Sequence, residues 1–373
     1  MNREEEIKDF LGREGWGQAA RAPLKGDAST RRYERLTLGE KRAILMDQPQ
    51  AAEASACPPG ASPQERAALG YNALARLAGA DCHAFAGVAG FLHDLALSAP
   101  KIYAADYARG FMLIEDLGDD LYAEILARGA DEHALYETAI EALVRLHQAP
   151  APDSFAAGMR SVALLDYDDT AYLAEADLLL DWFFPAALGH MPGESLREDY
   201  HALWREALKP AHALSPVVVL RDYHAENLLW LPEREGAARA GLLDFQDALR
   251  GAPAYDLVSL LEDARRDVAP DFAEAMTKHY VQLARGHDSA FHEETFRAAA
   301  AALAAQRNVK IAGIFTRLWK RDGKKRYALY HPRIWRTIER DLAHPMLARL
   351  NAWFERNVPR AKRNALAKAA EAA

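Results

Sequence analysis

A short β-rich island inside a helical region is the feature that most constrains the fold of this chain. The island spans residues 217–248 and reads VVVLRDYHAENLLWLPEREGAARAGLLDFQDA. Helical patterns flank it, because apolar residues recur three and four positions apart in 137–148, 172–184 and 197–214. A bundle made only of helices has no need of such an island, so we expect the chemistry of the protein to lie there.

Strand and turn signals alternate along the island, which predicts strands at 217–220, 228–231 and 241–245, a loop at 221–227 and a turn at 232–236. If the second and third strands pair as an antiparallel hairpin, Asn227 at the start of one lies beside Asp244 near the end of the other. An amide oxygen and a carboxylate are then brought together, and both suit the preference of Mg²⁺ for oxygen ligands. Asp222 lies one short loop away, where it is free to act as a base.

Phosphoryl transfer needs this set of groups. One carboxylate accepts the proton of an attacking hydroxyl, and two further oxygen ligands hold the metal that bridges the nucleotide phosphates. The alternative is a coincidental hairpin, since Asp in a loop is more often a turn or cap residue than a base. The conjunction of strand, D-x-x-x-x-N, strand, turn, strand and terminal Asp favours phosphoryl transfer.

The N-terminal region has a different pattern from the rest. Short strands are predicted within 19–47 with a turn at Gly39, then a surface loop over 48–63, a helix over 65–80 and two strands around a turn within 99–120. The pattern after residue 119 is mostly helical apart from the island. The sequence therefore predicts an α+β fold with a small β-rich N-lobe, residues 1–118, and a larger, mainly helical C-lobe, residues 119–373.

Composition excludes several classes of protein. The 373 residues include 46 basic and 54 acidic side chains, a net charge of −8, which disfavours a nucleic-acid partner. Cys57 and Cys82 are too few for a disulfide framework or a four-cysteine zinc site. The N-terminus is acidic and amphipathic, unlike a secretory signal, and no apolar run is long enough to span a membrane. We expect a cytoplasmic monomer that binds neither nucleic acid nor membrane.

The motifs of the island resemble those of the aminoglycoside phosphotransferase-like kinases, relatives of the protein kinases. Asp222 followed by Asn227 stands where that family has its catalytic loop, and Asp244 in LLDFQDA stands where protein kinases have D-F-G. The resemblance covers residues 15–350 and implies a protein-kinase-like fold of two lobes. It also implies ATP and Mg²⁺ as cofactors, with Asp222 as the catalytic base and Asn227 and Asp244 as metal ligands.

Further stretches resemble one branch of that family, the bacterial anomeric amino-sugar kinases of cell-wall recycling: GDASTRRYERL at 26–36, ILMDQP at 44–49, MLIEDLGDDLY at 112–122, LRDYHAENLLWLP at 220–232, LEDARRDV at 261–268 and QRNVKIAGIFTRLWKRDGKKRY at 306–327. Those enzymes use ATP to phosphorylate the C1 hydroxyl of N-acetylmuramate and N-acetylglucosamine. The resemblance implies this activity and a small amino-sugar substrate. Two alternatives stay open: a kinase for an aminoglycoside, choline or homoserine, and a pseudokinase that binds nucleotide without transfer.

The turn GDASTRR offers groups that suit phosphate. Backbone N–H groups, hydroxyls and guanidinium groups are the donors expected to cover a nucleotide phosphate, and the candidates are Gly26, Ser29, Thr30, Arg31 and Arg32. Because successive strand residues alternate faces, one of the two arginines is expected to face the nucleotide and the other the solvent.

Two other positions bear on nucleotide binding. Met46 stands where kinase-like lobes usually carry a lysine on the third strand. Arg31 or Arg32 could replace the charge of that lysine. Its absence also leaves the pseudokinase as an alternative. The segment FMLIEDLGDD at 111–120 stands where kinase-like folds have the hinge between their lobes, and the resemblance implies that backbone groups around Glu115 and Leu117 read the adenine.

The acceptor side is predicted around the catalytic loop. His224 and Glu226 lie in the same loop as Asp222 and are candidates for contact with a sugar, although a lone loop histidine is more often structural. Asp256 is expected to cap a helix and to brace the loop. The segment 305–340 holds eleven Lys and Arg residues against two acidic ones, a local charge of +9 against −17 over the rest of the chain.

Most of these cations are expected to form a solvated helix face. Arg307, Lys310 and Arg317 share one face of that helix, which makes them weak candidates for binding an anionic group such as the lactyl carboxylate of muramic acid. A basic segment argues mildly against cationic acceptors.

Overall fold

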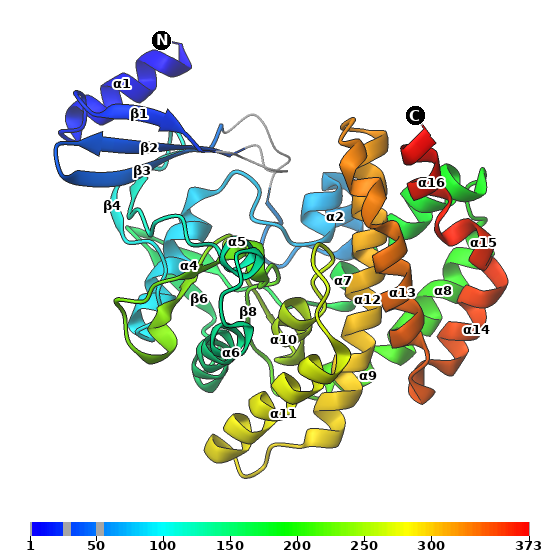
Figure 1. Cartoon of the computed structure of the whole chain (residues 1–373). Coiled ribbons are helices and arrows are strands. Elements are labelled where there is room, and N and C mark those ends of the chain that lie inside the picture. Colours follow the sequence, from blue (N-terminus) through cyan, green and yellow to red (C-terminus); the bar gives the residue numbers. More distant parts are fainter. Residues whose placement is uncertain (1, 25–30, 50–55, 373) are drawn as a thin grey trace. The chain divides into compact units, whose positions relative to one another are not determined.

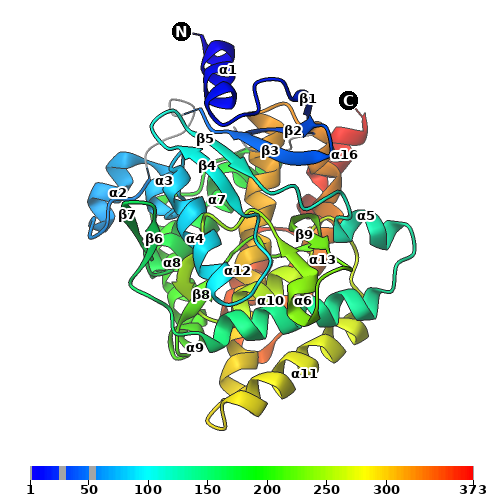
Figure 2. The ribbon, with the colours of Figure 1, turned by 90° about the vertical axis from the view of Figure 1, so that its left-hand side faces the viewer.

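The computed structural model describes residues 2–24, 31–49 and 56–372 (Figures 1 and 2). These residues divide between two units. The first unit comprises Met1–Ala142, Pro152–Leu165 and Glu226–Ala248, and the second comprises Leu143–Ala151, Asp166–Ala225 and Leu249–Ala373. The predicted boundary between lobes, after residue 118, lies inside the first unit and stays a prediction.

A five-stranded antiparallel sheet organises the N-terminal part of the first unit. Its order is β1 (Ala20–Pro23), β2 (Arg32–Leu38), β3 (Lys41–Asp47), β5 (Phe111–Ile114) and β4 (Ile102–Asp106). The strands predicted within 19–47 and within 99–120 are therefore confirmed. Gly39 has a φ of 61° in the turn between β2 and β3, a left-handed conformation that glycine adopts without steric cost.

Helix α1 (Arg3–Arg13) packs its apolar face against this sheet. A capping box starts the helix, because the Asn2 side chain accepts from the N–H of Glu5 and the Glu5 carboxylate accepts from the N–H of Asn2. The shared core consists of Ile7, Phe10, Leu11, Leu36, Ala43, Leu45, Phe111 and Leu113.

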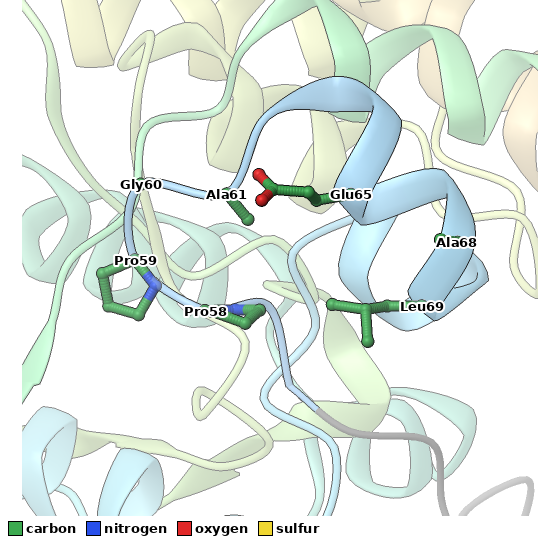
Figure 3. A pocket seen from close by; sticks show the side chains of 7 residues that line it. All are labelled: Pro58, Pro59, Gly60, Ala61, Glu65, Ala68 and Leu69. Carbon is green, nitrogen blue, oxygen red and sulfur yellow. The ribbon is translucent and has the colours of Figure 1, made fainter.

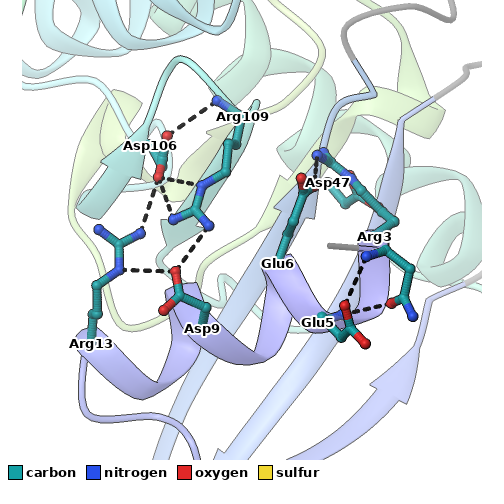
Figure 4. Close-up of polar contacts among 9 residues, drawn as sticks. Arg3, Glu5, Glu6, Asp9, Arg13, Asp47, Asp106 and Arg109 are labelled. Carbon is teal, nitrogen blue, oxygen red and sulfur yellow. Dashed lines mark hydrogen bonds and ion pairs between the residues drawn. The ribbon is translucent and has the colours of Figure 1, made fainter.

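Ion pairs at both ends of α1 add to this packing (Figure 4). Arg3 pairs with Asp47 at the end of β3 at 2.5 Å, and Arg13 pairs with Asp106 at the end of β4 at 3.0 Å. The Asp47 carboxylate is buried, so this pair is better shielded from solvent than the second one.

The remaining elements of the first unit include departures from the predicted pattern. They are α2 (Pro63–Leu69), α3 (Tyr71–Leu74), α4 (Cys82–Asp94), α5 (Tyr122–Ala127), β6 (Ser154–Ala157), β7 (Arg160–Ala163), the 3₁₀ turn η2 (Ala225–Asn227, at the junction of the units), β9 (Leu228–Trp230), the 3₁₀ turn η3 (Gly236–Arg239) and β10 (Ala240–Leu242), with α6 (Glu132–Gln148) crossing into the second unit. The single helix predicted over 65–80 is wrong, because Gly70 at a φ of 97° separates α2 from α3. The hairpin of β6 and β7, which turns at Gly158, lies in a region predicted to be helical.

The second unit is mainly helical, with one small pair of strands. Its elements are α7 (Asp169–Leu178), the π-helix η1 (Leu179–Leu188), α8 (Glu194–Ala207), α9 (Lys209–His212), β8 (Val217–Val219), β11 (Leu249–Gly251), α10 (Ala254–Leu261), α11 (Pro270–His287), α12 (Glu293–Lys320), η4 (Lys325–Tyr330), α13 (His331–Leu342), η5 (Pro345–Leu347), α14 (Ala348–Asn357), α15 (Arg360–Arg363) and α16 (Ala365–Ala372). No helix in the described part of the chain combines the length and apolar character needed to cross a membrane.

Helix α12 is the central element of the second unit (Figure 1). It packs against α7, η1, α9, α10 and α13, and its residues 302–313 are buried without a break. The approach of α7 is close at Gly313, where an added Cβ would lie 2.3 Å from the backbone carbon of Leu178. Polar side chains on this stretch of α12 therefore have to find partners inside the unit.

Candidate active site

The predicted hairpin of the β-rich island forms in the first unit. β9 pairs antiparallel with β10, with Leu228 opposite Leu242, and the N–H of Leu243 donates to the carbonyl of Asn227 at 3.0 Å. The prediction that Asn227 and Asp244 lie at the same end of one hairpin is therefore confirmed. The third strand ends at Leu242, earlier than predicted.

Asp244 has an unusual backbone conformation. Its φ of 57° lies in the left-handed region, which residues other than glycine rarely adopt and which is typical of functional sites. The carboxylate Oδ1 accepts from Nε2 of Gln246 at 2.9 Å and from Nη1 of Arg31 at 3.2 Å. The side chain stays 44% exposed, so it is accessible to a ligand.

The donor chemistry at this end of the hairpin fits Mg²⁺. The Asp244 carboxylate and the Asn227 amide supply hard oxygen donors, and Mg²⁺ is commonly held by one or two protein ligands together with water and substrate phosphates. Over the described ranges, no group of three or more His, Cys, Asp and Glu side chains could hold a metal ion by itself. The role of Asn227 and Asp244 as metal ligands remains a prediction.

Arg31 and Arg32 point in different directions. The Arg31 side chain is 9% exposed, and its Nε donates to Oε1 of Gln48 at 2.5 Å while its Nη1 reaches Asp244. Arg32 is exposed. Arg31 is therefore the inner and Arg32 the solvent-exposed member of the pair, and the expectation that the inner one faces the nucleotide stays a prediction.

Met46 is buried in β3 between Tyr33 of β2 and Met112 of β5, so this strand position carries no cation. The predicted phosphate-covering residues Gly26, Ser29 and Thr30 lie outside the described residues. Arg31 is thus a cation that the described part of the structure brings to Asp244.

The predicted hinge follows β5. The Glu115 carboxylate accepts from Arg234 at 2.8 Å and from the N–H of Lys101 at 3.1 Å, so its side chain is engaged within the unit. The N–H of Leu117 donates to no other residue of the described part of the chain. A backbone donor at Leu117 is what the predicted reading of adenine requires.

The catalytic-loop candidate belongs to the second unit and follows β8. Asp256 of α10 is completely buried, and its two carboxylate oxygens accept from the N–H groups of Leu220 at 2.6 Å and Arg221 at 2.8 Å. Burial raises the pKa of Asp256 to about 7. The predicted bracing of the loop by Asp256 is confirmed, whereas the residue that caps α10 is Pro253.

A buried ion cluster lies next to this loop. Glu175 of α7 is completely buried and pairs with the Arg221 guanidinium and, at 2.8 Å, with Nζ of Lys310 on α12. Tyr167 donates to the same carboxylate at 2.5 Å, and Tyr255 accepts from Lys310 at 3.3 Å. Burial alone would raise the pKa of Glu175, but Lys310 and Arg221 outweigh it and hold that pKa below its usual value.

The same cations act on Asp222. Burial raises the pKa of Asp222, and the opposing effects of Lys310, His224, Arg221 and Arg307 hold it below its usual value. Burial also lowers the pKa of His224 to about 4, so this imidazole is neutral at physiological pH and the lysine and arginines carry the effect. Asp222 is therefore a carboxylate, in the protonation state that a base needs.

The other acceptor candidates have varied surroundings. Arg307 is buried and donates to the carbonyl of Glu262 at 3.2 Å, whereas Arg317 is half-buried near the end of α12. Glu226 lies in η2 at the start of the first unit's share of the island. The contacts proposed between these residues, or Lys310, and an anionic substrate remain predictions.

Part of the basic character of 305–340 is compensated by acids that lie outside the segment. Arg333 and Arg336 pair with Asp267, and Arg340 pairs with Glu262. A count along the sequence misses such partners because they come from other elements. Glu175 was also missed, although a charged residue within the apolar stretch YLAEADLLL was a signal that it is buried with a partner.

The hollow in Figure 3 lies elsewhere in the first unit. It has a volume of about 520 Å³ and is lined by Pro58, Pro59, Gly60, Ala61, Glu65, Ala68 and Leu69. None of the predicted site residues lines it, so it carries no argument about catalysis.

Comparisons with known proteins agree with these features. Residues 21–290 match the model of the phosphotransferase enzyme family. The chain is 47% identical to an N-acetylmuramate/N-acetylglucosamine kinase of Caulobacter vibrioides, covering 94% of this chain and 95% of the relative. It is 34% identical to a kinase of the same name from Pseudomonas aeruginosa, covering 90% and 89% of the two chains.

The fold is also found among solved structures. A choline kinase of Streptococcus pneumoniae matches with a TM-score of 0.56 at 14% identity, covering 91% of this chain and 98% of that one. The predicted α+β, protein-kinase-like fold class is confirmed by this likeness. The extent of the family match and the identity to the two relatives establish that this chain is a member of the phosphotransferase enzyme family.

Proposed function

We propose that this chain is an ATP-dependent kinase that phosphorylates the anomeric (C1) hydroxyl of N-acetylmuramate and N-acetylglucosamine in peptidoglycan recycling. The observation that carries the proposal is the 47% identity, over almost the whole chain, to a relative whose name gives both sugars. Two observations support a working catalytic loop. Asp222 is ionised, and the carbonyl of Asn227 accepts from the N–H of Leu243, the residue before Asp244. A monomeric, cytoplasmic enzyme completes the proposal.

Asp222 is the proposed base, which accepts the proton of the sugar hydroxyl. Cations hold its pKa low, so it is a weak base, but an anomeric hydroxyl is more acidic than an ordinary alcohol and demands less of it. Orientation of the hydroxyl and neutralisation of charge are therefore the main sources of rate. Asp256 contributes by fixing the backbone immediately before Asp222.

Asn227 and Asp244 are the proposed ligands of Mg²⁺, which when bound would neutralise charge on the nucleotide phosphates. Arg31 lies against Asp244, so we assign to it the phosphate-binding charge that Met46 does not provide. With that charge supplied by Arg31, the residue immediately before β2, Met46 no longer favours a pseudokinase.

Arg31→Met is expected to raise the KM for ATP by about 10- to 100-fold, the scale of one lost charge-assisted hydrogen bond. Arg32→Met is the matched control, because Arg32 is the exposed neighbour, and it should change this KM less than about threefold, as surface substitutions usually do. Steady-state kinetics at saturating sugar measure both values. Equal effects of the two substitutions would remove Arg31 from the nucleotide site.

The acceptor class is tested by release of ADP in a panel of four acceptors. N-acetylmuramate and N-acetylglucosamine should support turnover with Mg²⁺-ATP, whereas choline and kanamycin should not. Turnover of only a cationic acceptor would replace the sugar assignment, and release of ADP with none of the four would contradict it.

A further inference from the structure

Asp263 is a buried carboxylate that none of the proposed steps uses. It lies two residues after the end of α10 in the segment LEDARRDV, and its side chain is 6% exposed. Its Oδ1 accepts from the N–H of Arg265 at 2.8 Å, while its Oδ2 is buried with no hydrogen-bond partner among the residues that the structure describes. A buried charged oxygen without a partner is costly, so this position calls for an explanation.

The backbone around Asp263 is well held. The Glu262 carboxylate accepts from Asn308 of α12 at 2.7 Å, and the carbonyl of Arg265 accepts from Arg333 of α13 at 2.8 Å. The segment is therefore anchored to two helices, and loose packing does not explain why the buried Oδ2 lacks a hydrogen-bond partner. A preformed acceptor on a fixed segment is typical of a ligand-binding group.

The surroundings of Asp263 relate it to the catalytic loop. Its charge acts on the imidazole of His224, which is buried and lies two residues after Asp222 in the loop. The charges of Asp222 and Arg307 act on the same imidazole. The charges of Asp263 and Asp222 therefore both raise the pKa of this one buried imidazole, and all three residues belong to the second unit.

We propose that Asp263 is a sugar-recognition residue, whose unpartnered Oδ2 accepts a hydrogen bond from a hydroxyl of the acceptor sugar. This inference rests on the proposed function. N-acetylmuramate carries its lactyl ether at C3, so the non-reacting hydroxyls that both proposed sugars share are those at C4 and C6. One of these two is the proposed partner of Asp263.

A cycle that changes both enzyme and substrate tests this assignment. With one of the two deoxy sugars, 4-deoxy- or 6-deoxy-N-acetylglucosamine, the kcat/KM of the wild-type protein should be at least about 10-fold lower than with N-acetylglucosamine. Asp263→Asn should lower kcat/KM with N-acetylglucosamine by a similar factor. In this variant, kcat/KM should then be the same for N-acetylglucosamine and for that deoxy sugar, and the KM for ATP should be unchanged. Asp267→Asn is the matched control, since this carboxylate of the same segment is 66% exposed and pairs with arginines of α13.

Equal losses of Asp263→Asn with all three sugars would overturn the assignment and leave a buried water as the partner of Oδ2. If Asp263→Asn fails to fold in a thermal melt, the wild-type series still decides, because equal kcat/KM for the parent and both deoxy sugars contradicts the proposal. A wild-type protein that phosphorylates no amino sugar would instead contradict the proposed function, and that result is distinguishable from a flat series.

Discussion

Asp222→Asn is expected to lower kcat by about 10³- to 10⁴-fold, the upper range for the loss of a general base. The substitution preserves the shape of the side chain but removes the carboxylate that would accept the hydroxyl proton. Asp256 should still hold the loop, because it contacts the backbone of Leu220 and Arg221 and not the side chain of Asp222. Single-turnover measurements of phosphoryl transfer check the loss.

Nucleotide affinity is the control for this variant. Calorimetric titration should give a Kd for nucleotide within about threefold of the wild-type value, since the proposed nucleotide residues Arg31 and Asp244 belong to the other unit. A variant that retains turnover within tenfold of wild type would remove Asp222 as the base. Asp267 is an exposed aspartate of the same unit, outside the catalytic loop, so Asp267→Asn should be close to wild type in both assays.

Lys310→Met is expected to lower the free energy of unfolding by about 3–5 kcal/mol, the usual cost of removing one partner from a buried ion pair. Glu175 would then retain Arg221 as its remaining cation in the completely buried cluster. Denaturant unfolding measures the loss. Lys320→Met is the matched control, because Lys320 is exposed at the end of the same helix and should change stability by less than about 0.5 kcal/mol.

The double variant Glu175→Gln, Lys310→Met separates charge from packing. Because both charges are then gone, it should be destabilised less than the sum of the two single variants. Strict additivity of the three values would mean that the pair contributes nothing beyond the packing of its side chains.

The pH dependence follows from the same cluster. Lys310 lowers the pKa of Asp222, so Lys310→Met should raise that pKa and move the acidic limb of kcat/KM to higher pH. Stability has a related dependence: the pKa of Glu175 is lower in the folded protein than its usual value of 4.5. The unfolded state therefore binds protons first, and this stabilisation is present above pH 4.5 and is lost as the pH falls through the folded-state pKa. An acidic limb that does not move in Lys310→Met would contradict the proposed action of Lys310 on Asp222.

The parts of the site that depend on local pattern could be predicted from the sequence. The pairing that aligns Asn227 with the end before Asp244 follows from two short strands, β9 and β10, which only residues 231–239 separate in the chain. The different exposures of Arg31 and Arg32 agree with the expected alternation of consecutive side chains, with Arg31 immediately before β2 and Arg32 its first residue. Both predictions required only near neighbours in the chain.

The parts that depend on distant partners could not be predicted. Glu175 and Lys310 are 135 positions apart in the chain, and no periodicity relates them. The charge of the segment 305–340 was misleading for the same reason, since Asp267 and Glu262 lie outside it. The hairpin of β6 and β7 was missed because its strands are only four residues long, although Gly158 marks its turn.

The position of the new phosphate is the most direct test of the proposed function. Purified protein incubated with Mg²⁺-ATP and N-acetylglucosamine or N-acetylmuramate should give a product whose phosphorus NMR signal couples to the anomeric proton, as in a sugar 1-phosphate. A signal that couples to the C6 protons, or phosphorylation of choline or kanamycin alone, would contradict the assignment of this chain as an anomeric amino-sugar kinase.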